Sequence, residues 1–116
     1  MATASDVKKA RVIIEIDGEE YTLIPSPEAI LGLSDKYGGL APLNQALGAF
    51  NIRAMADIVI AGLGLEGKDA KAMMDAVIAA DKADMIRPLS NFVGILANGG
   101  RPLKAEKAEE GSSGPL

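Results

Sequence analysis

The sequence predicts an α+β domain in which an N-terminal β-hairpin packs on a bundle of four to five short helices. Two observations support this class. Residues 11–24 alternate apolar and polar side chains around Asp17-Gly18, a pattern typical of a half-buried two-stranded ribbon. Residues 26–98 carry apolar side chains at helical spacing, in segments separated by Gly, Pro and Asn. We therefore expect a flexible arm at 1–10, a single domain at 11–100 and a disordered tail at 101–116.

The expected hairpin has a defined register. A two-residue loop pairs Ile14 with Tyr21, and the apolar face then consists of Val12, Ile14, Ile16, Tyr21 and Leu23. The same register sets Glu15 opposite Glu20, which is mildly unfavourable. A four-residue loop would relieve that repulsion and keep the same faces, because the shift is even. An isolated hairpin is marginally stable, so helices must cover the apolar face.

Three helices are expected after the hairpin. Ser26-Pro27-Glu28 is a strong helix start, and this first helix runs to about Tyr37 before Gly38-Gly39. A short helix follows from Pro42 to about Phe50, with Leu43, Leu47 and Phe50 on its inward stripe. Asn51 then caps a helix from Ile52 to Gly62, which we expect to be the most buried.

Two further helices follow a Gly-rich loop at 62–67. The first runs from about Asp69 to Ala80, and its apolar side consists of Ala70, Met73, Met74, Val77 and Ile78. The last runs to Asn98, and it starts at Asp84 or Arg87 depending on whether Pro88 lies in its first turn. Its inward residues are Ile86, Leu89, Phe92, Val93 and Leu96.

Composition excludes several kinds of chemistry. The 116 residues include no Cys and no His, so thiolate nucleophiles, iron–sulfur clusters and imidazole bases are excluded. A net charge of −4 argues against nucleic acid as the main partner. The longest apolar-rich stretch, 52–65, is interrupted by two charges and is too short for a membrane span. We expect a protein of the cytoplasm with no cofactor and no bound metal.

The candidate chemical groups each have a structural interpretation that we favour. The pairs Asp81/Asp84 and Asp69/Asp75 could act as acid and base or bind a metal, but capping and solvated roles are commoner. The loop at 62–67 lacks the spacing of a phosphate loop and is interpreted as a helix connection. Four methionines of the helical region could form either an adaptable binding surface or ordinary core, and we favour the core. They are Met55, Met73, Met74 and Met85. No constellation indicates an enzyme.

The order of features resembles the small tail assembly chaperone family of long-tailed phages and gene transfer agents. The hairpin pattern I-x-x-D-G-x-x-Y-x-L of that family corresponds here to Ile14–Leu23. Its acidic helix end with glycine corresponds to Asp35–Gly38, and its I-x-x-L/I-x-x-A/G-G-L helix to Ile52–Leu63. The resemblance covers roughly residues 11–98. Departures are Lys68-Asp69, where many relatives have Ser/Thr-Asp-Glu, and Pro88 in the last helix.

The resemblance implies a non-enzymatic chaperone that binds the tape-measure protein, recruits tail-tube subunits and leaves before the tail is complete. It would act in the bacterial host cytoplasm and be absent from the finished particle. We expect no nucleic acid or membrane partner, and self-association stays open. The candidate partner-binding residues lie on the exposed side of the last helix and at the start of the tail; they are Phe92, Ile95, Leu96 and Leu103.

Two other functions remain as alternatives. One is a small DNA-binding transcriptional regulator that uses the helices near 52–62 and 69–80 as a helix-turn-helix. Few side chains there suit base edges, and the domain is acidic. The other is a structural tail protein that stays in the particle.

Overall fold

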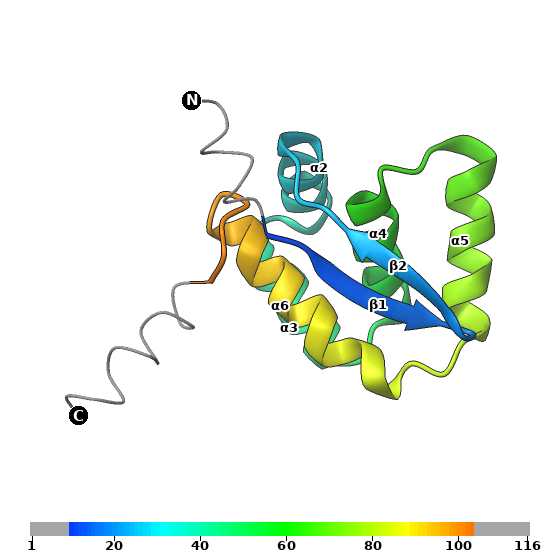
Figure 1. Ribbon diagram of the computed structural model, residues 1–116. Helices are drawn as coiled ribbons and strands as arrows, with labels where there is room; N and C mark the ends of the chain where they lie inside the picture. The colour runs from blue at the N-terminus through cyan, green and yellow to red at the C-terminus, as the bar shows by residue number, and fades with distance from the viewer. Residues whose placement is uncertain (1–9, 104–116) are drawn as a thin grey trace.

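The computed structural model describes residues 10–103, within which a two-stranded antiparallel hairpin precedes five α-helices (Figure 1). This is the α+β arrangement that the sequence predicts. The expectations for residues 1–9 and 104–116 lie outside the described residues. Residues 101–103, expected in the tail, belong to the folded part, since the Asn98 side-chain amide donates to the Pro102 carbonyl oxygen at 2.7 Å.

The hairpin has the predicted register. Strand β1 (Val12–Ile16) pairs with β2 (Glu19–Leu23), with Ile14 opposite Tyr21. Asp17 and Gly18 have φ values of 53° and 82°, as a type I′ turn requires. Glu15 does lie opposite Glu20, and because both are exposed, water and salt screen their repulsion. The two-residue loop is therefore confirmed.

The helices follow in the predicted order. Their bounds are α2 (Pro27–Tyr37), α3 (Leu40–Gly48), α4 (Ile52–Leu63), α5 (Gly67–Ala79) and α6 (Ile86–Ala97), with a 3-10 turn, η1 (Ala83–Met85), before α6. Ser26 Oγ accepts the Ala29 N–H at 3.0 Å, which confirms the predicted cap of α2. Asn51 Oδ1 accepts the Ala54 N–H at 3.0 Å and caps α4 in the same way. Short side-chain caps thus fix both helix starts.

The end of α3 differs from the prediction. The helix stops at Gly48, and Phe50 adopts φ 64°, in the left-handed region. The Phe50 N–H bonds to the Leu47 carbonyl oxygen and the Asn51 N–H to that of Ala46, which is the Schellman end of a helix. This turn directs Phe50 outward, and its side chain is 49% exposed. The expectation that Phe50 extends the inward stripe is wrong.

The start of α6 lies between the two predicted alternatives. Residues 83–85 form the 3-10 turn, and α6 proper begins at Ile86. Pro88 is the third residue of α6 and lies in its first turn, where an α-helix leaves backbone N–H groups unpaired. The sequence leaves open whether Pro88 lies in the first turn or kinks the helix, and the first turn is the place observed.

The core forms where the hairpin and α6 meet α4. Strand β2 packs on α4, β1 on α6, α3 on α6 and α5 on α4 (Figure 1). Seven of the twelve residues of α4 are buried, as expected for the most buried helix. Gly62 lies directly against β2, because a Cβ added there would be 2.8 Å from Leu23 Cβ. The Ile24 N–H also donates to the Gly62 carbonyl oxygen at 2.9 Å.

Within residues 10–103, no helix combines the length and the apolar character needed to cross a membrane.

Candidate functional site

Three of the four predicted partner-binding residues lie inside the protein. Phe92 and Leu96 are at most 1% exposed, and Ile95 is 6% exposed. The cause is the position of α6, which packs against β1 and against α2, α3 and α4. The expectation that Phe92 and Leu96 face a partner from an exposed side of α6 is therefore wrong for the folded chain.

Leu103 lies on the surface of α6. Its side chain is partly exposed, and a Cβ added to Gly94 would be 3.0 Å from Leu103 Cδ2. The absence of a side chain at Gly94 thus lets the chain after α6 lie directly on the helix backbone.

Ile95 and Leu103 meet at one open pocket of about 330 Å³. The rest of its lining comes from the start of β1 (residues 10–13), from Pro88 and Asn91 of α6, and from Pro102. The one charged side chain in this lining is Arg11. Polar and apolar groups both line this open pocket, so a partner could place a small side chain of either kind in it, and the pocket holds no acid–base pair for catalysis.

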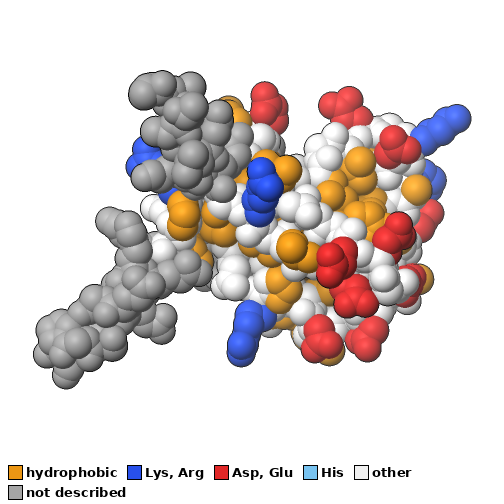
Figure 2. All heavy atoms as spheres, viewed as in Figure 1, with side chains coloured by type: hydrophobic (Ala, Val, Ile, Leu, Met, Phe, Trp, Pro, Cys, Tyr) orange, Lys and Arg blue, Asp and Glu red, His pale blue; other side chains and the backbone are white. Residues whose placement is uncertain are grey.

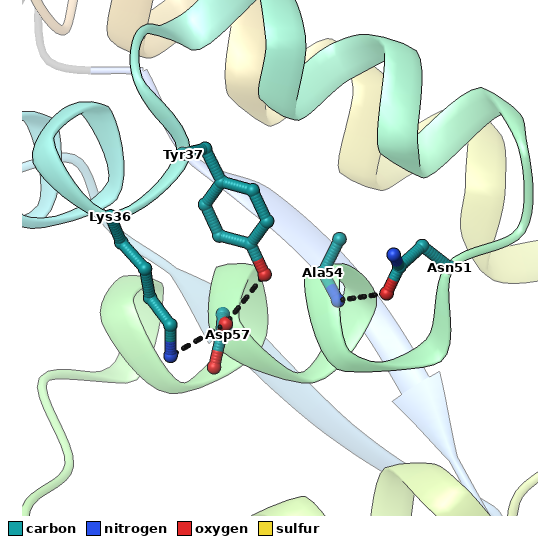
Figure 3. Close-up of polar contacts among 5 residues, drawn as sticks. All are labelled: Lys36, Tyr37, Asn51, Ala54 and Asp57. Carbon is teal, nitrogen blue, oxygen red and sulfur yellow. Dashed lines mark hydrogen bonds and ion pairs between the residues drawn. The ribbon is translucent and has the colours of Figure 1, made fainter.

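A buried carboxylate joins α2 to α4 (Figure 3). The Asp57 side chain is 9% exposed, and its Oδ2 accepts the Tyr37 hydroxyl at 2.6 Å. Lys36 Nζ lies 3.0 Å from the same oxygen, and the lysine side chain is 51% exposed. Two donors on the end of α2 therefore converge on one carboxylate in the middle of α4.

The Tyr37 hydroxyl acts as a donor in this cluster. Burial, followed by the hydrogen bond to Asp57 and its negative charge, raises the pKa of Tyr37 above the ordinary tyrosine value. The phenol is thus protonated at neutral pH and does not serve as a base. The cluster holds two helices together, because the buried charge has both an ion-pair partner and a hydrogen bond.

In the sequence, Asp57 stands out only as an interruption of an apolar stretch. It does carry a signal, since a carboxylate inside the helix expected to be the most buried must have a partner. Tyr37 lies 20 residues away, however, and spacing along one helix does not reveal a partner on another.

The aspartates of the two pairs considered above, Asp69, Asp75, Asp81 and Asp84, are all exposed. Asp81 Oδ1 accepts the Ala83 N–H at 3.2 Å and so closes the turn before η1. Across residues 10–103, no group of three or more acidic side chains is placed to hold a metal ion.

The Gly-rich loop is a helix connection. Gly64 has φ 67° and ends α4, and the Leu65 N–H bonds to the Ile60 carbonyl oxygen. The methionines mostly fill the core: Met55, Met73 and Met85 are buried, while Met74 is partly exposed. Ile78, which the sequence places on the inward side of α5, is instead 52% exposed, because α5 packs mainly on one neighbour, α4.

Acidic side chains dominate one part of the surface. Figure 2 shows them gathered on the half of the visible face that carries the hairpin turn. Glu15, Asp17, Glu19 and Glu20 are all exposed there. On α5, the second helix of the DNA-binding alternative, Lys68 and Lys71 alternate with Asp69 and Asp75. Phosphate backbones would meet carboxylates at both places.

Comparison of this chain with protein-family models, with curated proteins and with solved structures finds no match.

Proposed function

We propose that this chain is a non-enzymatic tail assembly chaperone of a phage or gene transfer agent, which binds the tape-measure protein and recruits tail-tube subunits. The proposal starts from the resemblance of the hairpin, the end of α2 and α4 to that family. The observation that supports it best is that these segments form one unit. Leu23 of β2 lies on Gly62, and Tyr37 of α2 bonds to Asp57 of α4.

The pocket beside α6 is the proposed contact point for the tape-measure protein. A tape-measure protein is a long helical chain, and side chains from one face of such a helix could enter this open pocket, whose lining has a single charged residue, Arg11. The lining residues include no aromatic side chain. Aromatic anchors contribute much of the energy of tight interfaces, so this pocket favours the modest affinity that release requires. The proposed site of action is the host cytoplasm, with the protein absent from the finished particle.

The test is a co-purification with the products of the neighbouring genes, among which the proposal expects a tape-measure protein and a tail-tube protein. Tagged wild-type protein and two variants, Leu103→Asp in the pocket and Leu31→Asp on α2, are expressed with the tape-measure and tube proteins. Leu31 is the matched control because it is 63% exposed and does not line the pocket. Circular dichroism establishes that each variant is folded.

The wild type and Leu31→Asp should retain the tape-measure protein, and Leu103→Asp should retain much less. Retention of DNA without tail proteins would overturn the proposal in favour of the DNA-binding regulator. Recovery of the chain in purified particles at tube-like copy number would instead favour the structural tail protein. Equal retention by both variants would remove the pocket from the proposal.

A further inference from the structure

Phe50 occupies a backbone position that three other helices of this fold give to glycine. Helices α2, α4 and α6 each end at a left-handed residue, namely Gly38 (φ 74°), Gly64 (φ 67°) and Gly99 (φ 74°). At the end of α3 the corresponding residue is Phe50, at φ 64°. Residues other than Gly, Asn and Asp rarely adopt this backbone conformation. The Phe50 side chain is also 49% exposed, so folding of the single chain gives little reason for an aromatic residue there.

Phe50 lies in a segment without charged side chains, which ends at the exposed Arg53. Residues 38–52 contain no Asp, Glu, Lys or Arg, although 24% of the chain is charged. On α3, Ala41, Asn44, Gln45 and Gly48 are exposed and follow one another at helical spacing. Ile52, 39% exposed, lies just beyond Phe50. We call these six residues the α3 face.

A second uncharged segment lies on α6, beginning just after the exposed Arg87. Residues 88–100 are also free of charged side chains, and α3 packs on α6. The Ser90 hydroxyl donates to Asn44 Oδ1 at 3.2 Å, which links the two helices at the surface. Protein interfaces are depleted in charge at their centre and enriched in aromatic residues, and the α3 face has both properties.

The charge pattern favours a second copy of this chain as the occupant. Each copy carries a net charge of −4, so two copies repel each other unless they meet through an uncharged surface. In a two-fold dimer the same patch is used by both partners, so residues near the axis face their own copies. A carboxylate or an ammonium group cannot pair with itself. The amides of Asn44 and Gln45 can, because each offers a donor and an acceptor.

We propose that the α3 face binds a second copy of this chain in a two-fold symmetric dimer, with Phe50 as its apolar anchor. The proposal is independent of the proposed function. Helix α3 has nine residues and is about 14 Å long, while a stable interface buries about 800 Å² on each partner. We therefore expect a weak dimer, with a dissociation constant on the order of micromolar.

The experiment is sedimentation equilibrium of the full chain over a wide concentration range. Gln45→Glu and Gln45→Lys are measured alone and as an equal mixture, and Ala72→Glu on the exposed side of α5 is the matched control. Each charged variant alone should dissociate, because like charges meet near the axis. The mixture should form a heterodimer, because the new charges are opposite. Ala72→Glu should dimerise like the wild type.

Phe50→Gly provides a second readout that misfolding cannot mimic. Glycine adopts φ 64° without strain, so the variant should be folded, with an unfolding midpoint at least equal to that of the wild type. It should nevertheless dimerise at least tenfold more weakly. A wild type that stays monomeric at every concentration would overturn the proposal. So would dimers that persist unchanged in Gln45→Glu, Gln45→Lys and Phe50→Gly.

Discussion

Replacing Gly62 with alanine tests how closely β2 lies on α4. The new methyl carbon would be 2.8 Å from Leu23 Cβ and 3.0 Å from Leu23 Cδ2. Rotation of the leucine side chain can move Cδ2 but not Cβ, which is fixed to the backbone. Strand β2 must therefore shift away from α4, and the bond from the Ile24 N–H to the Gly62 carbonyl oxygen would weaken with it.

Two opposing effects set the magnitude for Gly62→Ala. Alanine in place of glycine within a helix is favourable by up to about 1 kcal/mol. Overpacking of a well-filled core costs about 1–3 kcal/mol, and Leu23 is fully buried. We expect a net loss of about 1–2 kcal/mol in the free energy of unfolding.

Gly32→Ala is the matched control. Gly32 lies inside α2, and a Cβ added there would have no atom within 4 Å. This substitution should stabilise the protein by about 0.5–1 kcal/mol, because only the backbone effect remains. The same change of residue should thus have opposite signs at the two sites.

Urea unfolding followed by circular dichroism measures both variants, with the slope of the transition as a check on two-state behaviour. A double-mutant cycle with Leu23→Ala adds a further test. Leu23→Ala should cost less in the Gly62→Ala background than in the wild type, because the new methyl group then occupies part of the space left by the leucine. If Gly62→Ala were as stable as Gly32→Ala, the close approach of β2 to α4 would be refuted.

Three further predictions concern polar groups. Asp57→Ala should lower the free energy of unfolding by about 1–3 kcal/mol, and Asp57→Asn by less, because an amide oxygen still accepts the Tyr37 hydroxyl; equal losses in urea unfolding would contradict this. Since the pKa of Tyr37 is raised in the fold, by burial first and by Asp57 next, its contribution to stability is fully present below about pH 10 and is lost as the pH rises further. The unfolding temperature of Tyr37→Phe should therefore fall less steeply with rising alkaline pH than that of the wild type. Parallel curves of unfolding temperature against pH would count against the prediction. Lys82 Nζ donates to the Val77, Ile78 and Ala80 carbonyl oxygens at 3.3, 2.8 and 2.6 Å, so Lys82→Met should cost about 1 kcal/mol. Its effect should appear as faster hydrogen exchange in the last turn of α5, with the exposed Lys71→Met as a near-neutral control.

Features determined by a few neighbouring residues could be predicted from the sequence. The Asp17-Gly18 turn fixes the hairpin register, and Ser26 and Asn51 accept the backbone bonds expected of helix caps. Each depends on a contact between residues at most three positions apart or on one turn type. Such preferences depend on short segments of sequence, so they can be predicted without knowing the rest of the fold.

The sequence could not show which neighbour covers each apolar side chain. Ile78 belongs to the inward pattern of α5 but is 52% exposed, whereas Ile95 is buried and only 6% exposed. The difference arises because α5 packs mainly on α4, while α6 is enclosed by β1 and other helices. Helical periodicity identifies an apolar stripe, but its width and burial depend on packing between elements far apart in the chain.

The candidate site could not be predicted either, because it also depends on packing between elements far apart in the chain. Predicted residues Ile95 and Leu103 do share the pocket beside α6, but Arg11 and Ile13 reach it from the other end of the chain. Apolar spacing continues past Gly48 and so predicts Phe50 on the inward stripe, whereas the left-handed turn directs its side chain outward. Long-range contacts and one unusual backbone angle therefore define the features on which the two proposals rest.

The bond from the Ala10 N–H to the Gly100 carbonyl oxygen, 3.2 Å long, has a consequence for protein engineering and for gene fusion. It holds the two ends of the described region, residues 10–103, close to each other. A host protein could thus carry this domain as an insertion in a single surface loop, entering and leaving at nearly one point without stretching the host backbone. The strands and helices would form an independent appendage, and the host fold on either side of the insertion would stay continuous.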